Sequence, residues 1–145
     1  MSLAMIGEGA AYEFRWRRWA LLRDTLLLID RAPNRFPTFS AIGDALVAGS
    51  LKLPAAVLGE EIAAILRRVR GHTVEELAIS PTTASVLYLG AKLDLPRRLS
   101  EHERNAVAPP GTEGDLGEFF ASMCESMLEV CARPLIDGRI EIIDG

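Results

Sequence analysis

Hydrophobic positions recur at helical spacing along much of the chain. The clearest amphipathic segment follows Pro54, which suits the first position of a helix because its missing N–H needs no partner there. Gly71 is expected to end this helix. One side of the segment is apolar and the other is charged, and the apolar side consists of Leu58, Ile62, Ile65, Leu66 and Val69. The pattern predicts a helix with one face in the core.

The aromatic segment near the start allows two interpretations. Four apolar residues follow helical spacing: Trp19, Leu22, Leu26 and Ile29. This spacing predicts a helix over 13–31 that ends before Pro33. Strand-like alternation with charged residues is shown by Tyr12, Phe14 and Trp16. We predict the helix and leave open a short strand over 11–16 that leads into it.

Capping signals place further helices. Ser40 can cap a helix over 41–48. Three further helix starts are indicated. Two are capping boxes, at Thr73/Glu76 and Ser100/Glu103, and the third is a capping residue followed by proline, at Ser80-Pro81. The last helix begins near Asp115, and its expected buried face consists of Leu116, Phe119, Phe120, Met123, Met127 and Cys131.

The C-terminal segment has a strand signal. Asp137-Gly138 is a two-residue hairpin turn sequence, and an alternating apolar segment follows it over 139–143. We therefore predict a short β-hairpin at this end of the chain.

Together these elements predict a mainly α fold. We expect a compact bundle of five to six helices with a short C-terminal β-hairpin and, as an option, one N-terminal strand. Residues 11–145 would form a single globular domain. Residues 1–10 would be a flexible N-terminal tail, whose start is typical of vector-derived residues. The predicted core contains Trp19, Leu22, Leu26, Ile62, Leu66, Phe119, Phe120 and Met123.

Composition excludes several classes of protein. The 145 residues are 49% hydrophobic and 25% charged, which is ordinary for a globular domain and excludes a disordered chain. The longest apolar run, 26–29, is far shorter than the roughly 20 residues that span a membrane. No signal peptide is recognisable, so we expect a cytoplasmic protein. The preference for Arg over Lys, together with many Ala and Leu residues, is associated with GC-rich bacterial genomes.

Cysteine and histidine positions predict no metal and no cofactor. Cys124 and Cys131 are seven residues apart, about 10.5 Å along a helix, which is too far for a disulfide. They share a helix face with Met123 and Met127, and we interpret all four as core. The two histidines form no zinc-binding spacing with each other or with the cysteines.

Nucleic-acid binding is disfavoured. The pI is about 5.2, although Arg15, Arg17 and Arg18 alternate with aromatic residues. Residues 73–92 have the outline of a helix-turn-helix, but the turn lacks its usual glycine and the second helix carries one cation, Lys92. A degenerate helix-turn-helix regulator is therefore the third functional hypothesis.

Charge is distributed unevenly and supplies the first hypothesis. Residues 1–72 have a formal charge of +3 and residues 73–145 of −7. No catalytic motif is present, so we predict no catalytic residues and a non-enzymatic protein-interaction domain. The predicted partner-binding residues are Glu118, Glu125 and Glu129, on the solvent side of the last helix.

The preferred version of this hypothesis is an immunity-type or antitoxin-type inhibitor that presents an acidic face to a basic partner protein. The second hypothesis is a small-molecule-binding or enzymatic helical domain with its site between helices. Neither involves a membrane, and a homodimer is compatible with both.

Overall fold

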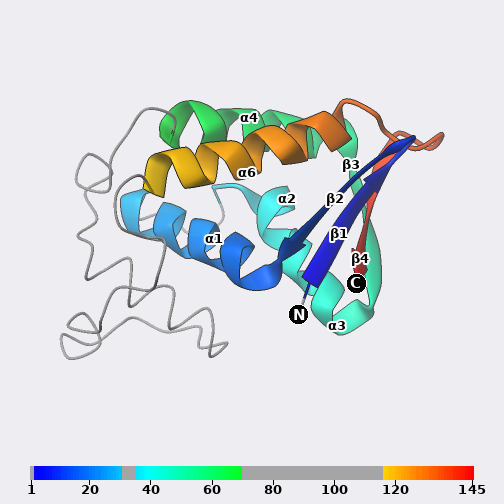
Figure 1. Ribbon diagram of the computed structural model, residues 1–145, viewed down its shortest axis with the longest axis horizontal. Helices are drawn as coiled ribbons and strands as arrows, with labels where there is room; N and C mark the ends of the chain where they lie inside the picture. Colours follow the sequence, from blue (N-terminus) through cyan, green and yellow to red (C-terminus); the bar gives the residue numbers. More distant parts are fainter. Residues whose placement is uncertain (1, 31–34, 70–115) are drawn as a thin grey trace.

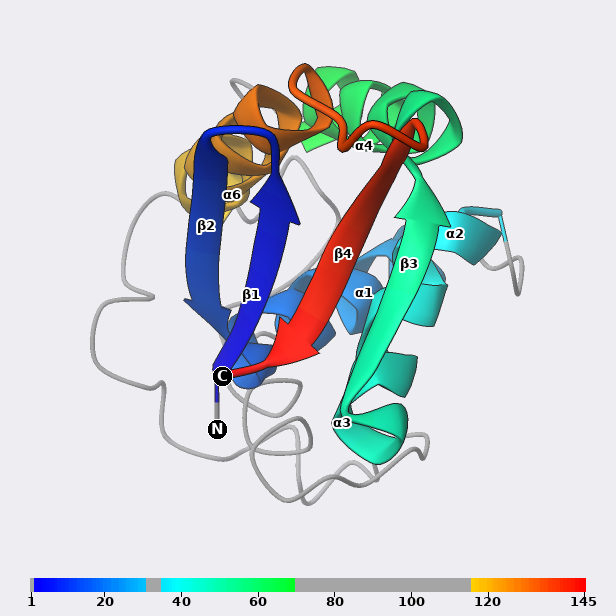
Figure 2. The ribbon, with the colours of Figure 1, turned by 90° about the vertical axis from the view of Figure 1, so that its right-hand side faces the viewer.

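The computed structural model describes residues 2–30, 35–69 and 116–145, which form a four-stranded antiparallel sheet with helices behind it (Figures 1 and 2). The sheet order is β2-β1-β4-β3. The strands are β1 (Ser2–Gly7), β2 (Ala10–Arg15), β3 (Ser50–Pro54) and β4 (Arg139–Asp144). The long helices are α1 (Trp16–Asp30), α4 (Ala55–Val69) and α6 (Leu116–Cys131). Between α1 and β3 lie the short helices α2 (Pro37–Ser40), η1 (Ala41–Asp44) and α3 (Ala45–Ala48).

Alternating burial explains why the strands form a sheet with one covered face. In β1, Leu3 and Met5 are fully buried, and in β4 the same is true of Ile140 and Ile142. The residues between them are partly exposed on the other face. Because successive side chains point to opposite faces of a sheet, each strand contributes its apolar residues to one core.

The sheet joins parts of the chain that are far apart in sequence. Met5 of β1 lies opposite Ile142 of β4, and Ile142 lies opposite Leu51 of β3. The C-terminal strand is therefore inserted between the N-terminal strand and β3. This arrangement places the two ends of the chain side by side (Figure 2).

Trp19 anchors α1 against the short helices. Its side chain is 2% exposed, and its Nε1–H donates a hydrogen bond to the Phe39 carbonyl at 3.1 Å. Gly43 lies so close to the indole ring that a Cβ there would overlap it. This close contact holds the segment before β3 against the core.

The predicted mainly α bundle is wrong. The fold is mixed α/β, and the four-stranded sheet is a principal layer. Each strand has only five or six residues, so its alternation involves two or three inward side chains. Such a short pattern is weak until its partners are known, because strand stability comes from cross-strand and core packing.

Two local predictions, for residues 2–7 and for the C-terminal segment, are also wrong. Residues 2–7, expected in a flexible tail, form a central strand of the sheet. The expected C-terminal hairpin is also absent from the sheet: 139–144 form a strand, but its partners are β1 and β3. Only the turn itself forms, where Gly138 N–H donates to the Leu135 carbonyl at 2.8 Å and Gly138 has φ +76.

Other predictions are confirmed. The apolar face of α4 is buried at all five predicted positions. The optional strand at 11–16 corresponds to β2, which leads directly into α1. Of the predicted core, the following side chains are buried: Trp19, Leu22, Leu26, Ile62, Leu66, Phe120 and Met123. The side chain of Phe119 lies outside the described residues, as do the predicted helices between 73 and 108.

Glu61 has a structural role that its sequence position did not reveal. Its Oε1 accepts hydrogen bonds from the backbone N–H groups of Thr38 and Phe39, both at 3.0 Å. These groups lie in α2, so one carboxylate from α4 satisfies donors that the short helix leaves unpaired. The contact links α4 to the segment that holds Trp19.

Candidate functional site

The exposed side of α6 is the site that the sequence predicted. Glu125 and Glu129 are both exposed, one helical turn apart, and Ser122 is exposed beside them. The opposite side is buried and contains Phe120, Met123, Cys124, Met127 and Val130. The side chain of Glu118, the third predicted binding residue, lies outside the described residues.

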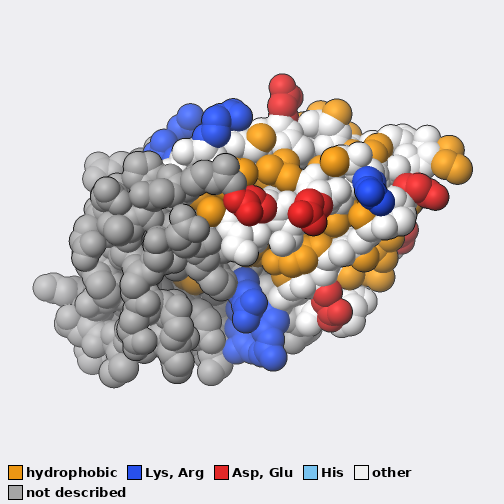
Figure 3. All heavy atoms as spheres, turned by 45° about the horizontal axis from the view of Figure 1, so that its top comes forward, with side chains coloured by type: hydrophobic (Ala, Val, Ile, Leu, Met, Phe, Trp, Pro, Cys, Tyr) orange, Lys and Arg blue, Asp and Glu red, His pale blue; other side chains and the backbone are white. Residues whose placement is uncertain are grey.

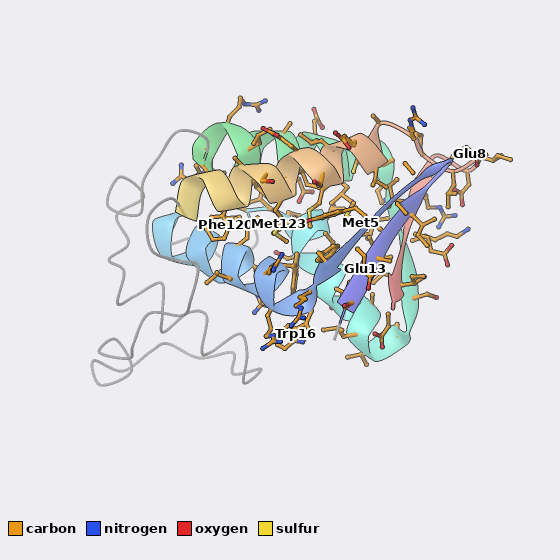
Figure 4. All side chains as sticks on the ribbon, in the orientation of Figure 1. Met5, Glu8, Glu13, Trp16, Phe120 and Met123 are labelled. Carbon is orange, nitrogen blue, oxygen red and sulfur yellow. The ribbon has the colours of Figure 1, made fainter. Side chains whose placement is uncertain are left out.

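Packing of α6 fixes where its acidic side points. Phe120 and Met123 lie on the side of α6 that is turned toward α1 (Figure 4). The neighbouring helix α4 approaches α6 closely at Gly59, where a Cβ would stand 3.5 Å from the Cys131 Cβ. With its other sides covered, α6 presents its carboxylates outward on a rigid element.

Acidic side chains are spaced over this face and do not form one continuous patch. Glu60 of α4 is exposed, as are Glu125 and Glu129 of α6. In Figure 3, the acidic groups over α4 and α6 are separated by apolar and uncharged side chains. A partner would therefore contact separate carboxylates with apolar and uncharged side chains between them.

The placement of Glu129 is electrostatically unfavourable for the helix itself. It lies two residues before the end of α6, where the helix dipole is negative, and the last turn of α6 contains no basic residue. Glu125 lies four residues earlier, so the two like charges also repel each other. Each effect costs a few tenths of a kcal/mol on an exposed surface.

The two cysteines lie on the core side of α6, as predicted, and both are free thiols. Burial, and to a smaller extent the negative charge of the neighbouring Glu125, raise the pKa of Cys124 from 9.0 to about 12. Burial also raises the pKa of Cys131 to about 11. Reactive cysteines need the opposite shift, because the thiolate is the nucleophile. Neither thiol is suited to catalysis.

These thiols predict a loss of stability at alkaline pH. Above pH 9 the unfolded chain releases thiol protons that the folded chain still holds, so the unfolded state is favoured as pH rises toward about 12. We expect wild type to lose more unfolding free energy between pH 8 and pH 10 than a Cys124→Ala, Cys131→Ala variant. Urea denaturation of both proteins at the two pH values measures this difference. Equal losses would contradict the assignment.

Asp137 forms a second group of charges, at the turn before β4. Its carboxylate lies 3.2 Å from Lys52 Nζ and 3.5 Å from Arg139 Nε, and it also accepts a hydrogen bond from the Arg139 backbone N–H. That backbone hydrogen bond and the bond from Lys52 lower the pKa of Asp137. The group is exposed and links β3 to the turn, so we interpret it as structural.

No metal site is found among the described residues: no three His, Cys, Asp or Glu side chains there are grouped to hold an ion. Both histidines and the helix-turn-helix candidate at 73–92 lie outside the described part of the chain. In the part that is described, no helix is both long and apolar enough to cross a membrane.

Comparisons with protein-family models, with curated proteins and with solved structures found no match.

Sequence reasoning placed Glu125 and Glu129 correctly on the exposed face, because helical periodicity separates the two sides of α6. It missed Glu61 as an intramolecular acceptor and Lys52 as the partner of Asp137. Both partners are distant in sequence, and no local spacing indicates them.

Proposed function

We propose that this protein is a non-enzymatic interaction domain that binds a basic partner protein through the acidic side of α6. The binding residues are Glu118, Glu125 and Glu129. An immunity-type or antitoxin-type inhibitor, which covers a cationic surface of a nuclease or similar toxin, is the form of this function that we favour.

The observation that carries the proposal is the position of Glu125 and Glu129. Both are exposed on a helix whose other side is firmly buried. Both also oppose helix stability, through mutual repulsion and, for Glu129, through the helix dipole. Exposed carboxylates on a well-packed helix are suited to contact a basic partner.

Two further features support a binding surface. The α6 backbone is held by the core and by α4, so a partner would not need to order it on binding. The surface also mixes carboxylates with uncharged side chains (Figure 3). Exposed charges of this kind act mainly by steering association, so we expect binding that is fast and sensitive to salt.

The test replaces Glu118, Glu125 and Glu129 by Gln and measures capture of proteins from a lysate of the native host. We expect wild type to retain a basic protein at low salt and the triple variant to lose most of it. The melting temperature should stay the same or rise slightly, because the replaced charges oppose the helix.

A control removes two exposed charges away from both α6 and β2, with Asp44→Asn and Asp144→Asn. This control should retain the partner as wild type does. Equal capture by the α6 variant and wild type would refute the proposal. A large loss of stability in the α6 variant would instead show that these carboxylates are structural.

A further inference from the structure

The outer edge of β2 has hydrogen-bonding groups without a strand partner among the described residues. β2 is the first strand in the sheet order, and β1 is its only neighbour there. Figure 2 shows it as the outermost strand on the side away from β3. The side chains of Ala11, Glu13 and Arg15 are all exposed.

The hydrogen-bond pattern that joins β1 to β2 and β4 determines which backbone groups of β2 point away from the sheet. Gly145 N–H donates to the Ser2 carbonyl, so the even-numbered residues of β1 bond to β4 and the odd-numbered ones to β2. Their partners in β2 are Ala10, Tyr12 and Phe14. The N–H and C=O groups of 11, 13 and 15 therefore point away from the sheet.

The opposite edge of the sheet is protected. Asp144 N–H donates to the Gly49 carbonyl, so the groups of Ser50, Lys52 and Pro54 point outward from β3. Pro54 has no N–H to offer, and a proline at this place is typical of an edge that does not accept another strand. The two edges therefore differ in their capacity to pair.

We propose that β2 pairs with β2 of a second copy of this chain, antiparallel about Tyr12, to form a homodimer with one continuous eight-stranded sheet. This proposal uses a different surface from the acidic side of α6 and does not depend on it. The outward groups of Ala11 and Glu13 would form about four backbone hydrogen bonds between the copies.

Side chains favour this register over one that is shifted by two residues toward Arg15. On the covered face, Tyr12 would meet the second copy's Tyr12, and Ala10 would meet Phe14, which gives a wholly apolar row. Tyr12 is only half-buried in one copy and stacks on Phe14 at 5.4 Å between ring centroids. On the other face, Glu13 would lie opposite Ala11. Moving the register by two residues would place Glu13 opposite Glu13, which is unfavourable.

The two ends of β2 also carry opposite charges that would lie close together in this register. Glu8 lies at the tip of the hairpin, and Trp16 lies at the opposite end of β2 (Figure 4). An antiparallel second copy would bring its Glu8 to within one residue of Arg15 at both ends of the pair. Arg133 is a second cation near the same hairpin, so a charge change at Glu8 would affect Arg133 as well as the Arg15 of the second copy. Cross-linking is therefore the decisive test of the register.

The first experiment blocks the edge without breaking the sheet. Ala11→Pro removes an outward N–H and leaves the bonds to β1 intact, because proline is tolerated on the open side of an edge strand. We expect sedimentation equilibrium to show a dimer for wild type and a dissociation constant at least roughly tenfold higher for Ala11→Pro. The matched control, Lys52→Pro on the outer edge of β3, should dimerise as wild type does.

The second experiment determines the register. Ala11→Cys and Glu13→Cys replace exposed side chains and should fold normally. Under mild oxidation, an equimolar mixture of the two variants should form a disulfide-linked dimer, since opposed residues lie about 5.5 Å apart between Cα atoms. Each variant alone should not, and wild type serves as the background control.

Several outcomes would overturn the proposal. A wild-type monomer at all concentrations that stay in solution would do so, as would a dimer that Ala11→Pro leaves unchanged. Cross-linking of Glu13→Cys alone, without cross-linking in the mixture, would refute the register. These results do not depend on partner capture through α6, so the two proposals can fail separately.

Discussion

Phe120→Ala is expected to lower the free energy of unfolding by about 3–5 kcal/mol. The ring is completely buried on the core side of α6 and lies toward α1 (Figure 4). Its removal loses the transfer free energy of the ring and leaves a cavity that the surrounding helices fill only in part. Urea denaturation at fixed protein concentration measures the loss.

Ser122→Ala is the matched control for this variant, because Ser122 is exposed on the same helix. It should change stability by less than about 0.5 kcal/mol. A similarly small effect of Phe120→Ala would mean that the inward face of α6 is assigned wrongly. In that case the outward position of Glu125 and Glu129 would also be wrong.

Gly7→Ala is expected to destabilise the fold by about 1–3 kcal/mol or more. A Cβ at this position would overlap the backbone carbonyl oxygen of Arg133. That oxygen also accepts a hydrogen bond from Glu8 N–H at 2.8 Å, so neither backbone can move away without losing the contact. The site joins the β1–β2 hairpin to the end of α6.

Gly59→Ala provides a control of opposite sign. Its Cβ would stand in ordinary contact with Cys131, and the glycine lies inside α4. Alanine there should raise stability by up to about 1 kcal/mol, because glycine is a poor helix former. Thermal or urea unfolding of the two variants compares them directly. Equal effects would show that the contact between Gly7 and Arg133 does not constrain the fold.

If both proposals hold, the protein has two independent interaction surfaces. The acidic side of α6 would bind the basic partner, and the edge of β2 would join two copies. A dimer would then present two acidic surfaces, which increases the apparent affinity for a partner that is itself multivalent.

The sequence by itself determined which faces of α4 and α6 are buried. In α4 and α6 the apolar residues recur over four turns, so the separation of core and solvent sides was readable for Phe120 and Met123 and for Glu125 and Glu129. It also indicated the alternation in β2 and the turn at Asp137-Gly138. All of these signals depend only on residues that are close in sequence.

Only the tertiary structure decided the sheet, and with it the fold class. β1 and β3 could not be identified from alternation, because the outward residues Ala4 and Ile6 of β1 are apolar as well and β3 has only five residues. β4 is stabilised by partners about 90 and about 140 residues away along the chain. The same is true of Glu61, whose hydrogen bonds reach α2 from α4. Pairings of this kind depend on which distant segments bury each other's apolar faces, and that choice is made by the whole core rather than by local pattern.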